Sequence, residues 1–400
     1  MTPAHSLRAL HVIPAVAPRY GGPSRVVSEL CRALRTHGVD ARIATTDADG
    51  DDRLDVPLGS EHEFEGVPTW FFDRQVSESF KYSRPLAAWL DEHVSEFDIA
   101  HIHAIYSHSS IAASRACRTH GVPYVLRPLG TLDPWSVSRK ALRKRALWYA
   151  GVGDLVRGAA AVHYTTEAER RKAESVVGPT PGRVIGLGVD SELFDLEPIR
   201  EGVPYVLFMS RLHEKKGLDL LIEAFGTATA VDYQEWRLVV AGTGNSEYES
   251  RMRELVSRLG LSERVAFVGW ASGDRRHELL QSASCFALTS HQENFGLAVA
   301  EAMAVGLPVL VSEGVDLAEE VRRGAAGIVT PPQIGAIVDG LRALFEADRT
   351  AMGANAQRLA RNAFAWDSIA ASVVALYRQS TGSLHSPLRA GDTLEVGSVA

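Results

Sequence analysis

Two glutamates in the segment 290–308 have the spacing that most directly suggests chemistry. Glu293 and Glu301 are separated by seven residues within SHQENFGLAVAEAMAVGLP. A pair of carboxylates can act as general acid and base, as in a glycosidase. If a helix begins between them, Glu301 lies inside it and can accept hydrogen bonds from a ribose diol, while Glu293 lies ahead of it and can reach sugar hydroxyls. The alternative is a capped surface helix with two solvated glutamates.

The residues between the two glutamates predict an anion site. The run Cys285–Leu288 is typical of a buried strand, and the sequence after it predicts a helix that begins near Phe295. The N–H groups of Phe295, Gly296 and Leu297 then lack partners within the helix, and with the helix dipole they bind phosphate well. Gly296 also allows the backbone to approach a ligand closely.

Two cations occupy another loop between a predicted strand and a predicted helix. Arg211 and Lys216 lie in SRLHEKKG, after an apolar run that ends at Met209. Fixed positive charges there can hold a diphosphate and stabilise it as a leaving group. Arginine supplies a planar fork and lysine a point charge. Lys215 is an adjacent candidate, and the alternative is a solvated basic loop.

Glycines follow two further predicted strands. Gly21 and Gly22 precede a predicted helix, where glycine suits an anion or a closely approaching ligand. A plain turn explains this pair equally well. Gly242 is the first glycine of an AGTG segment that resembles the start of a dinucleotide fingerprint, but Glu247 stands where the third glycine would be. A nicotinamide or flavin cofactor is therefore not expected, and neither is any other cofactor.

A histidine ends a third predicted strand of the first half. His101 and His103 share one face of the run Ile99–His103, because residues two apart in a strand point the same way. His103 is nearer the carboxyl end of the strand, where it could bond a sugar hydroxyl or the transferred group. His108 and His163 are alternatives, and a structural role for the histidine stays open.

Residues 139–145, from Arg139 to Arg145, read RKALRKR and carry five basic side chains. Leu142 lies within this run, and Trp148 and Tyr149 follow it. Such a helix could rest on an anionic lipid surface or hold an anionic acceptor. A solvated helix face is the alternative.

Asp47 and Asp49 form an Asp-x-Asp pair of the kind that holds a divalent metal in some sugar-transferring enzymes. They lie in a stretch rich in acidic residues and glycine, 47–55. We therefore interpret this stretch as a solvated acidic loop and expect no required metal.

The elements that must position these residues alternate between short apolar runs and amphipathic ones, which predicts parallel sheets covered by helices. The second half of the chain repeats this alternation after a domain boundary predicted at 190–204. Ligands of such sheets bind beyond the carboxyl ends of the strands. We therefore expect two domains that face each other across a cleft. The predicted strands are 7–14, 41–45, 99–103, 122–127, 161–164, 205–209, 238–241, 265–268, 285–288 and 309–311, and the predicted helices are 24–37, 109–120, 218–225, 249–259, 297–304 and 334–345.

Composition is consistent with a two-domain protein of 400 residues, of which 46% are hydrophobic. The net charge of −7 argues against nucleic acid as a partner. No apolar run is long enough to span a membrane, and the N-terminal segment lacks the pattern of a signal peptide. The cysteines, Cys31, Cys117 and Cys285, are widely spaced in apolar segments, which predicts buried thiols in a reducing cytoplasm.

Taken together and in this order, the motifs resemble the family-4 group of retaining glycosyltransferases with the GT-B fold. The segment with Glu293 and Glu301, followed by EAMAVGLPV, is the most specific match. SRLHEKKG, YGGPS, DIAHIHA, RPLGTLDPW, VIGLGVDSELF and AGTG fall in the expected order, and the match covers roughly residues 7–378. Leu187 stands where the family often has Asn, and Pro128 or Leu129 where it commonly has His.

The resemblance implies a role for each matching residue. Glu293 resembles the glutamate that contacts the donor sugar, and Glu301 the one that binds ribose. Arg211 and Lys216 resemble the ligands of the donor diphosphate. His103 resembles the acceptor-side histidine. The pair Gly21 and Gly22 resembles the glycines that lie close to the donor phosphate and the acceptor.

The resemblance also implies a GT-B architecture of two Rossmann-like domains with parallel sheets facing a central cleft. The expected domains are 1–190 for the acceptor and 203–365 for the nucleotide sugar, then a helix at 366–380 that crosses back and a disordered tail at 381–400. The implied activity is metal-independent transfer, with retention, of a sugar from a UDP- or GDP-sugar to a saccharide or lipid-linked saccharide, in the cytoplasm or at the inner face of the membrane. A sugar-nucleotide epimerase, a soluble-acceptor transferase of the sucrose or trehalose type, and a bilobed solute-binding protein remain alternatives.

Overall fold

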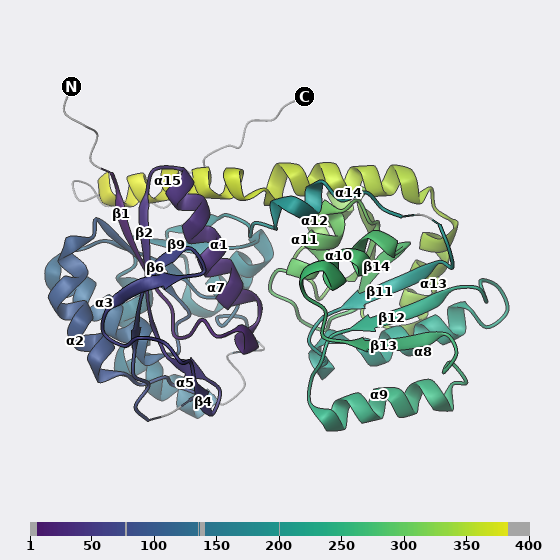
Figure 1. The fold of residues 1–400 in the computed structure, drawn as a ribbon, viewed down its shortest axis with the longest axis horizontal. Coiled ribbons are helices and arrows are strands. Elements are labelled where there is room, and N and C mark those ends of the chain that lie inside the picture. The colour runs from purple at the N-terminus through teal and green to yellow at the C-terminus, as the bar shows by residue number, and fades with distance from the viewer. Residues whose placement is uncertain (1–5, 77, 135, 137–140, 200, 383–400) are drawn as a thin grey trace. The chain divides into compact units, whose positions relative to one another are not determined.

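The computed structural model describes residues 6–76, 78–134, 136, 141–199 and 201–382. It divides into two compact units, each described here by itself. Unit 1 comprises Met1–Ile185 and Ile369–Ala400, and unit 2 comprises Gly186–Ser368. Purple and blue segments in Figure 1 belong to unit 1 and most green segments to unit 2.

Unit 1 is built on an eight-stranded sheet with the order β10-β9-β8-β7-β1-β2-β6-β5. All neighbouring strands pair in parallel except β5, which is antiparallel to β6 at the edge of the sheet. The parallel pattern expected from the sequence therefore ends at β6. The strands are β1 (Arg8–Val12), β2 (Asp40–Thr46), β5 (Glu61–Phe64), β6 (Val67–Phe72), β7 (Ile99–His103), β8 (Tyr124–Arg127), β9 (Ala161–Tyr164) and β10 (Gly182–Val184).

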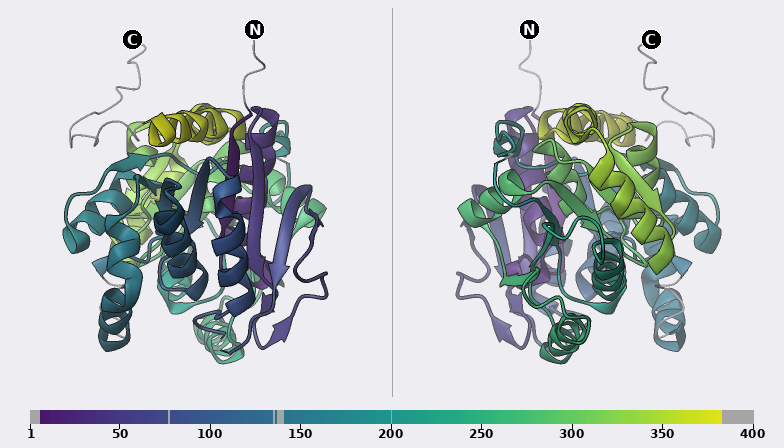
Figure 2. Two further views of the ribbon diagram at one scale, coloured as in Figure 1. Left: turned by 90° about the vertical axis from the view of Figure 1, so that its left-hand side faces the viewer. Right: turned by 90° about the vertical axis from the view of Figure 1, so that its right-hand side faces the viewer.

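Helices cover the sheet of unit 1, as the left view of Figure 2 shows. Local signals determine where several begin and end. The Ser107 hydroxyl caps the start of α3 by accepting from the Ser110 N–H, and Gly121 ends it in the left-handed region with φ of 70°. The helices are α1 (Gly22–Thr36), α2 (Arg84–His93), α3 (His108–His120), α5 (Ala141–Leu147), α6 (Gly153–Arg157) and α7 (Glu167–Val177), with the short turns η1 (Pro18–Tyr20), η2 (Val94–Glu96) and η3 (Trp148–Val152).

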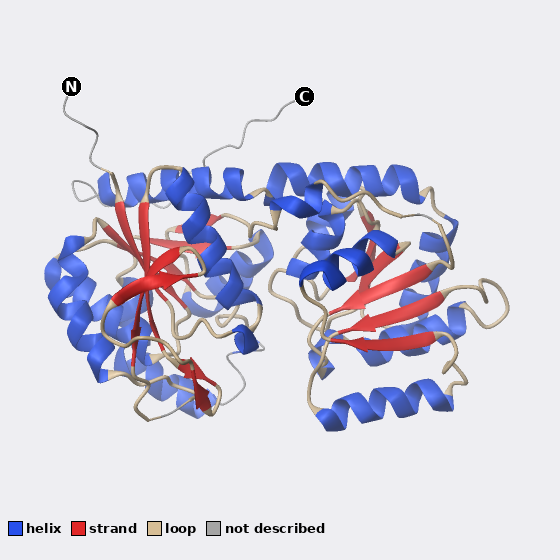
Figure 3. Ribbon diagram, viewed as in Figure 1, coloured by secondary structure: helices blue, strands red, loops and turns tan. Residues whose placement is uncertain are grey.

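Unit 2 contains a fully parallel six-stranded sheet with the order β13-β12-β11-β14-β15-β16 (Figure 3). The strands are β11 (Tyr205–Met209), β12 (Arg237–Ala241), β13 (Val265–Gly269), β14 (Cys285–Leu288), β15 (Val309–Ser312) and β16 (Gly327–Thr330). The helices are η4 (Ser191–Phe194), η5 (Glu214–Lys216), α8 (Leu218–Ala228), α9 (Ser246–Arg258), α10 (Gly273–Ser282), α11 (Leu297–Ala304), α12 (Ala318–Arg323), α13 (Ile334–Glu346) and α14 (Arg349–Phe364).

The last described helix, α15 (Trp366–Gly382), begins in unit 2, and its remainder from Ile369 belongs to unit 1. It includes Thr381 and Gly382, so the expectation of a disordered tail from residue 381 is wrong for these two residues. Residues 383–400, the rest of that predicted tail, lie outside the described residues.

The two faces of the sheet in unit 1 differ in chemistry. Side chains of successive strand residues point to opposite faces. Residues such as Leu10, Ile102 and Leu126 pack in the apolar core with α2 and α3. The opposite face, which we call the histidine face, carries His11, His101, His103, Arg127 and His163, all buried.

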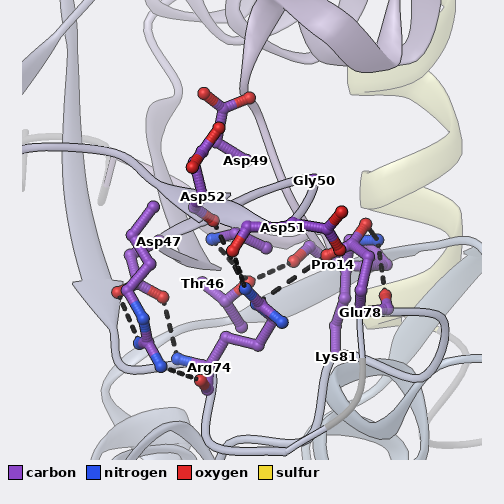
Figure 4. Close-up of polar contacts among 12 residues, drawn as sticks. Pro14, Thr46, Asp47, Asp49, Gly50, Asp51, Asp52, Arg74, Glu78 and Lys81 are labelled. Carbon is purple, nitrogen blue, oxygen red and sulfur yellow. Dashed lines mark hydrogen bonds and ion pairs between the residues drawn. The ribbon is translucent and has the colours of Figure 1, made fainter.

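The acidic stretch that follows β2 is only in part the solvated loop expected from the sequence, because Asp51, Asp52 and Asp55 are exposed but Asp47 is buried (Figure 4). Asp47 is only 2% exposed, and its carboxylate accepts hydrogen bonds from the Arg74 N–H at 2.8 Å and from Arg53 Nη1 at 3.0 Å. Asp49 pairs with Arg19 at 2.9 Å. The stretch forms a hairpin of β3 (Ala48–Asp49) and β4 (Asp52–Arg53), in which Arg53 of the hairpin itself pairs with Asp47, and Arg19 of η1 pairs with Asp49.

Within the described parts of the chain, every helix is too short or too polar to span a bilayer.

Candidate active site

The predicted cations follow β11 in unit 2. Arg211 lies two residues beyond the end of the strand and is exposed. Lys216 ends the turn η5, and its Nζ pairs with the Glu293 carboxylate from the loop after β14. Beside this pair, Lys215 Nζ donates to Gln292 Oε1 at 3.1 Å. The structure thus brings Lys216 and Glu293 together within one unit, although they are 77 positions apart in the sequence.

Glycines allow the neighbouring loops to approach this pair closely. Gly242 has φ of 137°, and a Cβ atom there would lie 1.9 Å from the Ser210 carbonyl oxygen, so only glycine fits. Gly217 has φ of 60°, and its Cβ would lie 2.2 Å from the Thr289 carbonyl oxygen.

Backbone hydrogen bonds join the same loops. The Leu212 N–H donates to the Thr243 carbonyl at 2.9 Å, and the His291 N–H donates to the Lys215 carbonyl at 2.8 Å. Since β12, β11 and β14 are neighbours in the parallel sheet, their carboxyl ends form one continuous surface of loops.

Helix α11 begins at Leu297, as in the predicted helix 297–304 and two residues after Phe295. Gly296 precedes it in the left-handed region with φ of 90° and provides no side-chain cap. The Val299 N–H already donates to the Gly296 carbonyl at 2.8 Å, so a ligand would have to use the N–H groups that precede it. The Phe295 side chain is 3% exposed and packs edge-on against Phe364, with ring centroids 5.4 Å apart.

Glu301 lies inside α11 and is 4% exposed. Its Oε1 accepts a hydrogen bond from Arg276 Nη1 at 3.1 Å, and Nη2 of the same arginine contacts Asp190 Oδ2 at 3.4 Å. Arg276 comes from α10 and is 8% exposed. Its guanidinium supplies the positive charge that a buried carboxylate requires.

Sequence reasoning missed Arg276. Its position three and four residues before Leu279 and Leu280, which are buried on the same helix, was the available signal, because residues at this spacing share a helix face.

The predicted residues of unit 1 lie at the carboxyl ends of its strands. Gly21, with φ of 76°, and Gly22 open α1, and a Cβ at either position would meet no atom within 4 Å. His103 ends β7 but is 1% exposed, and its Nε2 lies 3.1 Å from His11 Nδ1.

A network of ring nitrogens extends from His103 across the histidine face. The Tyr377 hydroxyl of α15 bonds His101 Nδ1 at 2.7 Å and His11 Nε2 at 3.1 Å. Burial, the charge of Arg127 and the neighbouring His163 lower the pKa of His11 to about 3. Burial also lowers the pKa of His101 and His103, so these imidazoles are neutral at pH 7.

Two groups among the described residues place three potential metal ligands within 4.8 Å of one another. In the first group, His11, His101 and His103, the nitrogens already bond each other and Tyr377. The second group is Asp190, Glu192 and His277, and Arg276 already pairs with Asp190.

Family models match both halves of the chain. Residues 190–365 match the model described as glycosyl transferases group 1, and residues 21–188 match the glycosyl transferase 4-like domain. The boundary between the two matches falls close to the end of unit 1 at Ile185.

Curated relatives are similar over the whole length or over large parts of it. A GDP-mannose:cellobiosyl-diphosphopolyprenol alpha-mannosyltransferase from Xanthomonas campestris is 26% identical, over 94% of this chain and 98% of the relative. A D-inositol 3-phosphate glycosyltransferase from Acidothermus cellulolyticus is 28% identical, over 71% of this chain and 67% of the relative.

Solved structures share the fold. The sucrose-phosphate synthase of Thermosynechococcus elongatus superposes with a TM-score of 0.78 at 21% identity, covering 94% of this chain and 100% of that one. Anabaena HepE in complex with UDP and glucose gives 0.72 at 20% identity, covering 93% and 99%.

Proposed function

This chain belongs to the glycosyl transferases of group 1 and has the GT-B fold, and on that premise we propose that it transfers mannose from GDP-mannose to a hydroxyl of a diphosphopolyprenol-linked disaccharide. The observation that carries the donor and acceptor is the similarity to the Xanthomonas campestris mannosyltransferase, which spans nearly the full length of both proteins. Such a transfer fits the assembly of a cell-surface polysaccharide.

In the proposed reaction, unit 2 binds the donor. The two phosphoryl groups would be held by Arg211, Lys216 and the free N–H groups at the start of α11. Lys216 would exchange its contact with Glu293 for a phosphoryl oxygen, leaving that carboxylate to bind mannose hydroxyls. Glu301, held by Arg276, would accept from the ribose diol.

We propose transfer with retention and without a metal ion. The departing diphosphate, stabilised by the fixed cations, would accept the proton of the attacking hydroxyl on the same face of the sugar. The nearby positive charges reduce the need for a divalent ion. No covalent sugar–enzyme intermediate is then required, and Glu293 positions the sugar.

Unit 1 would bind the acceptor, with His103 and the glycines Gly21 and Gly22 as the candidate contacts. We further propose a peripheral position on an anionic membrane surface. The support is the exposure of Leu142 (86%) and Tyr149 (78%) close to the exposed Arg143 and Arg145. Arg139 and Lys140 of the predicted basic stretch lie outside the described residues.

Incubation of the purified enzyme with GDP-mannose and a diphosphopolyprenol-linked disaccharide tests the proposal. We expect a trisaccharide by mass spectrometry, an α-linked mannose by NMR, and full activity with EDTA present. A donor panel with UDP-glucose and UDP-galactose tests the nucleotide. Release of an altered sugar nucleotide without acceptor consumption would instead identify an epimerase, and binding without GDP release would identify a sugar-nucleotide binding protein.

A further inference from the structure

Arg127 is a buried cation that the proposed reaction has not yet used. It is the last residue of β8 in unit 1 and is 2% exposed. Its Nε–H is buried and has no hydrogen-bond acceptor. Among the residues that the structure describes, no carboxylate forms an ion pair with its guanidinium. Burying an unpaired charge is costly, so such a group indicates a missing anionic partner.

The imidazoles beside Arg127 do not supply negative charge. In the parallel pairing of β7 with β8, His103 stands directly opposite Arg127. The other neighbours on the histidine face are neutral imidazoles whose pKa is lowered by burial and by the charge of Arg127 itself. Burial lowers the pKa of Arg127 to about 10, so the guanidinium remains charged at pH 7.

Glu169 is the carboxylate whose charge acts most on Arg127, but the hydrogen bonds of its oxygens go to other groups. Oε1 accepts from the Gly130 N–H at 2.8 Å, and Oε2 accepts from the N–H and the hydroxyl of Thr165, both at 2.7 Å. Glu169 therefore joins the loops after β8 and β9 and leaves the guanidinium without a bonded counter-ion.

Shortly after both His103 and Arg127, a residue other than glycine has a positive φ. Ala104, directly after His103, has φ of 69°, and Leu129, two residues after Arg127, has φ of 57°. Non-glycine residues in the left-handed region are strained and concentrate at ligand sites. Both lie beyond the carboxyl ends of parallel strands, where ligands of such sheets bind.

We propose that Arg127, with His103 opposite it, is an anion subsite of unit 1 that binds a phosphoryl group of the acceptor's diphosphate. A guanidinium fork matches phosphoryl oxygens, and a neutral imidazole can donate one more hydrogen bond. The inference rests on the proposed function, because the only charges of a diphosphopolyprenol-linked disaccharide are its phosphoryl groups. Each unit then has its own cations for one diphosphate, Arg211 and Lys216 for the donor and Arg127 for the acceptor.

Acceptor kinetics test this assignment. Arg127→Met keeps an apolar stem and removes the charge, and Arg127→Lys keeps the charge without the fork. With the diphosphate-linked disaccharide, we expect Arg127→Met to raise the acceptor KM roughly 10- to 100-fold and Arg127→Lys to recover part of the loss. The KM for GDP-mannose, and kcat/KM for the same disaccharide on an uncharged alkyl chain, should change less than about twofold.

Thermal stability separates this role from a structural one. Removing an unpaired buried charge should leave the melting temperature of Arg127→Met unchanged or higher. Arg118→Met, which removes an exposed arginine of the same unit, is the matched control for activity. Equal losses on charged and uncharged acceptors, or a clear drop in melting temperature, would overturn the subsite.

A binding measurement keeps the inference testable if the proposed acceptor is wrong. In an Arg211→Ala/Lys216→Ala background, ³¹P NMR should still detect inorganic pyrophosphate binding, and adding Arg127→Met should abolish it. Pyrophosphate binding that is independent of Arg127 removes the subsite. If pyrophosphate binding depends on Arg127 but the kinetics show no preference for the charged acceptor, Arg127 is still an anion subsite. Only its proposed role in acceptor binding is then wrong.

Discussion

At the scale of single residues, Lys216 and Glu293 form an ion pair with each other when no donor is bound. Each charge neutralises the other, so neither is buried alone. A diphosphate that enters must compete with Glu293 for Lys216, which releases the carboxylate for sugar hydroxyls. The two residues would thus act in sequence on different parts of one donor.

Lys216→Ala should lower kcat by about 10²- to 10³-fold with a smaller change in donor KM, because the lost charge acts most on the diphosphate as it departs. Steady-state kinetics with saturating acceptor measure both parameters. Lys215→Ala is the matched control, since its Nζ bonds Gln292, and it should stay within about threefold of wild type. Near-normal turnover of Lys216→Ala would contradict the diphosphate assignment.

Arg276→Leu tests the role of the arginine that holds Glu301. We expect the free energy of unfolding to fall by about 3 kcal/mol, because a buried carboxylate loses its partner. Arg276→Leu/Glu301→Leu should recover part of this loss in urea unfolding. Arg276→Leu should also weaken the preference for GDP over 2′-deoxy-GDP, measured by calorimetry. An unchanged preference for GDP over 2′-deoxy-GDP would show that Glu301 does not bind the ribose.

At the scale of elements, the histidine face and α15 depend on each other. Tyr377 bonds His11 and His101, which extends the buried network from the sheet into the last described helix. The groups that face this network are Cys31 of α1, His11 of β1, His101 and His103 of β7, Arg127 of β8, His163 of β9 and Tyr377 of α15. Protonation of any of these imidazoles would add a buried positive charge beside Arg127.

The histidine face predicts that the folded protein loses stability at acid pH. The pKa of His11 and of His163 falls to about 3 in the folded chain, against about 6.5 when unfolded. The unfolded state therefore binds more protons between these values, so stability is complete above pH 6.5 and falls as the pH drops toward 3. Melting temperatures at pH 7.5 and pH 5 measure the slope, which His11→Gln should reduce. His120→Gln, at an exposed pair with Asp91, should leave the slope unchanged.

Some elements were predictable with their observed bounds. The runs at β7, β9, β11 and β14 contain apolar or β-branched residues between turn signals, and each matches the predicted strand. Strand β10, with three residues, is too short for such a pattern, whereas β16 was missed although it is as long as β9 and β14. Strand β5 was also missed, because three of its four residues are polar, and an edge strand in a mainly parallel sheet does not follow the buried-run rule.

At the scale of the whole molecule, association with a membrane would bring the enzyme to a lipid-linked acceptor. Leu142→Ser/Tyr149→Ser should reduce co-sedimentation with phosphatidylglycerol vesicles about tenfold or more, because both side chains expose apolar surface next to basic residues. Val231→Ser, at a position 80% exposed in unit 2, is the control. If the wild-type protein does not co-sediment with anionic vesicles, the proposed peripheral position on the membrane is wrong.

The sequence by itself determined the two-half α/β organisation, the order of the loops and the candidate residues on them, because periodicity and turn residues act over a few neighbouring positions. Only the tertiary structure decided which charged and polar groups meet. Arg276 reaches Glu301 across 25 residues, Lys216 reaches Glu293 across 77, and His101 reaches Tyr377 across 276. The same packing buried Asp47 among arginines and left Arg127 without a bonded anion, since the partners of a buried charge depend on segments that the chain brings together only when it folds.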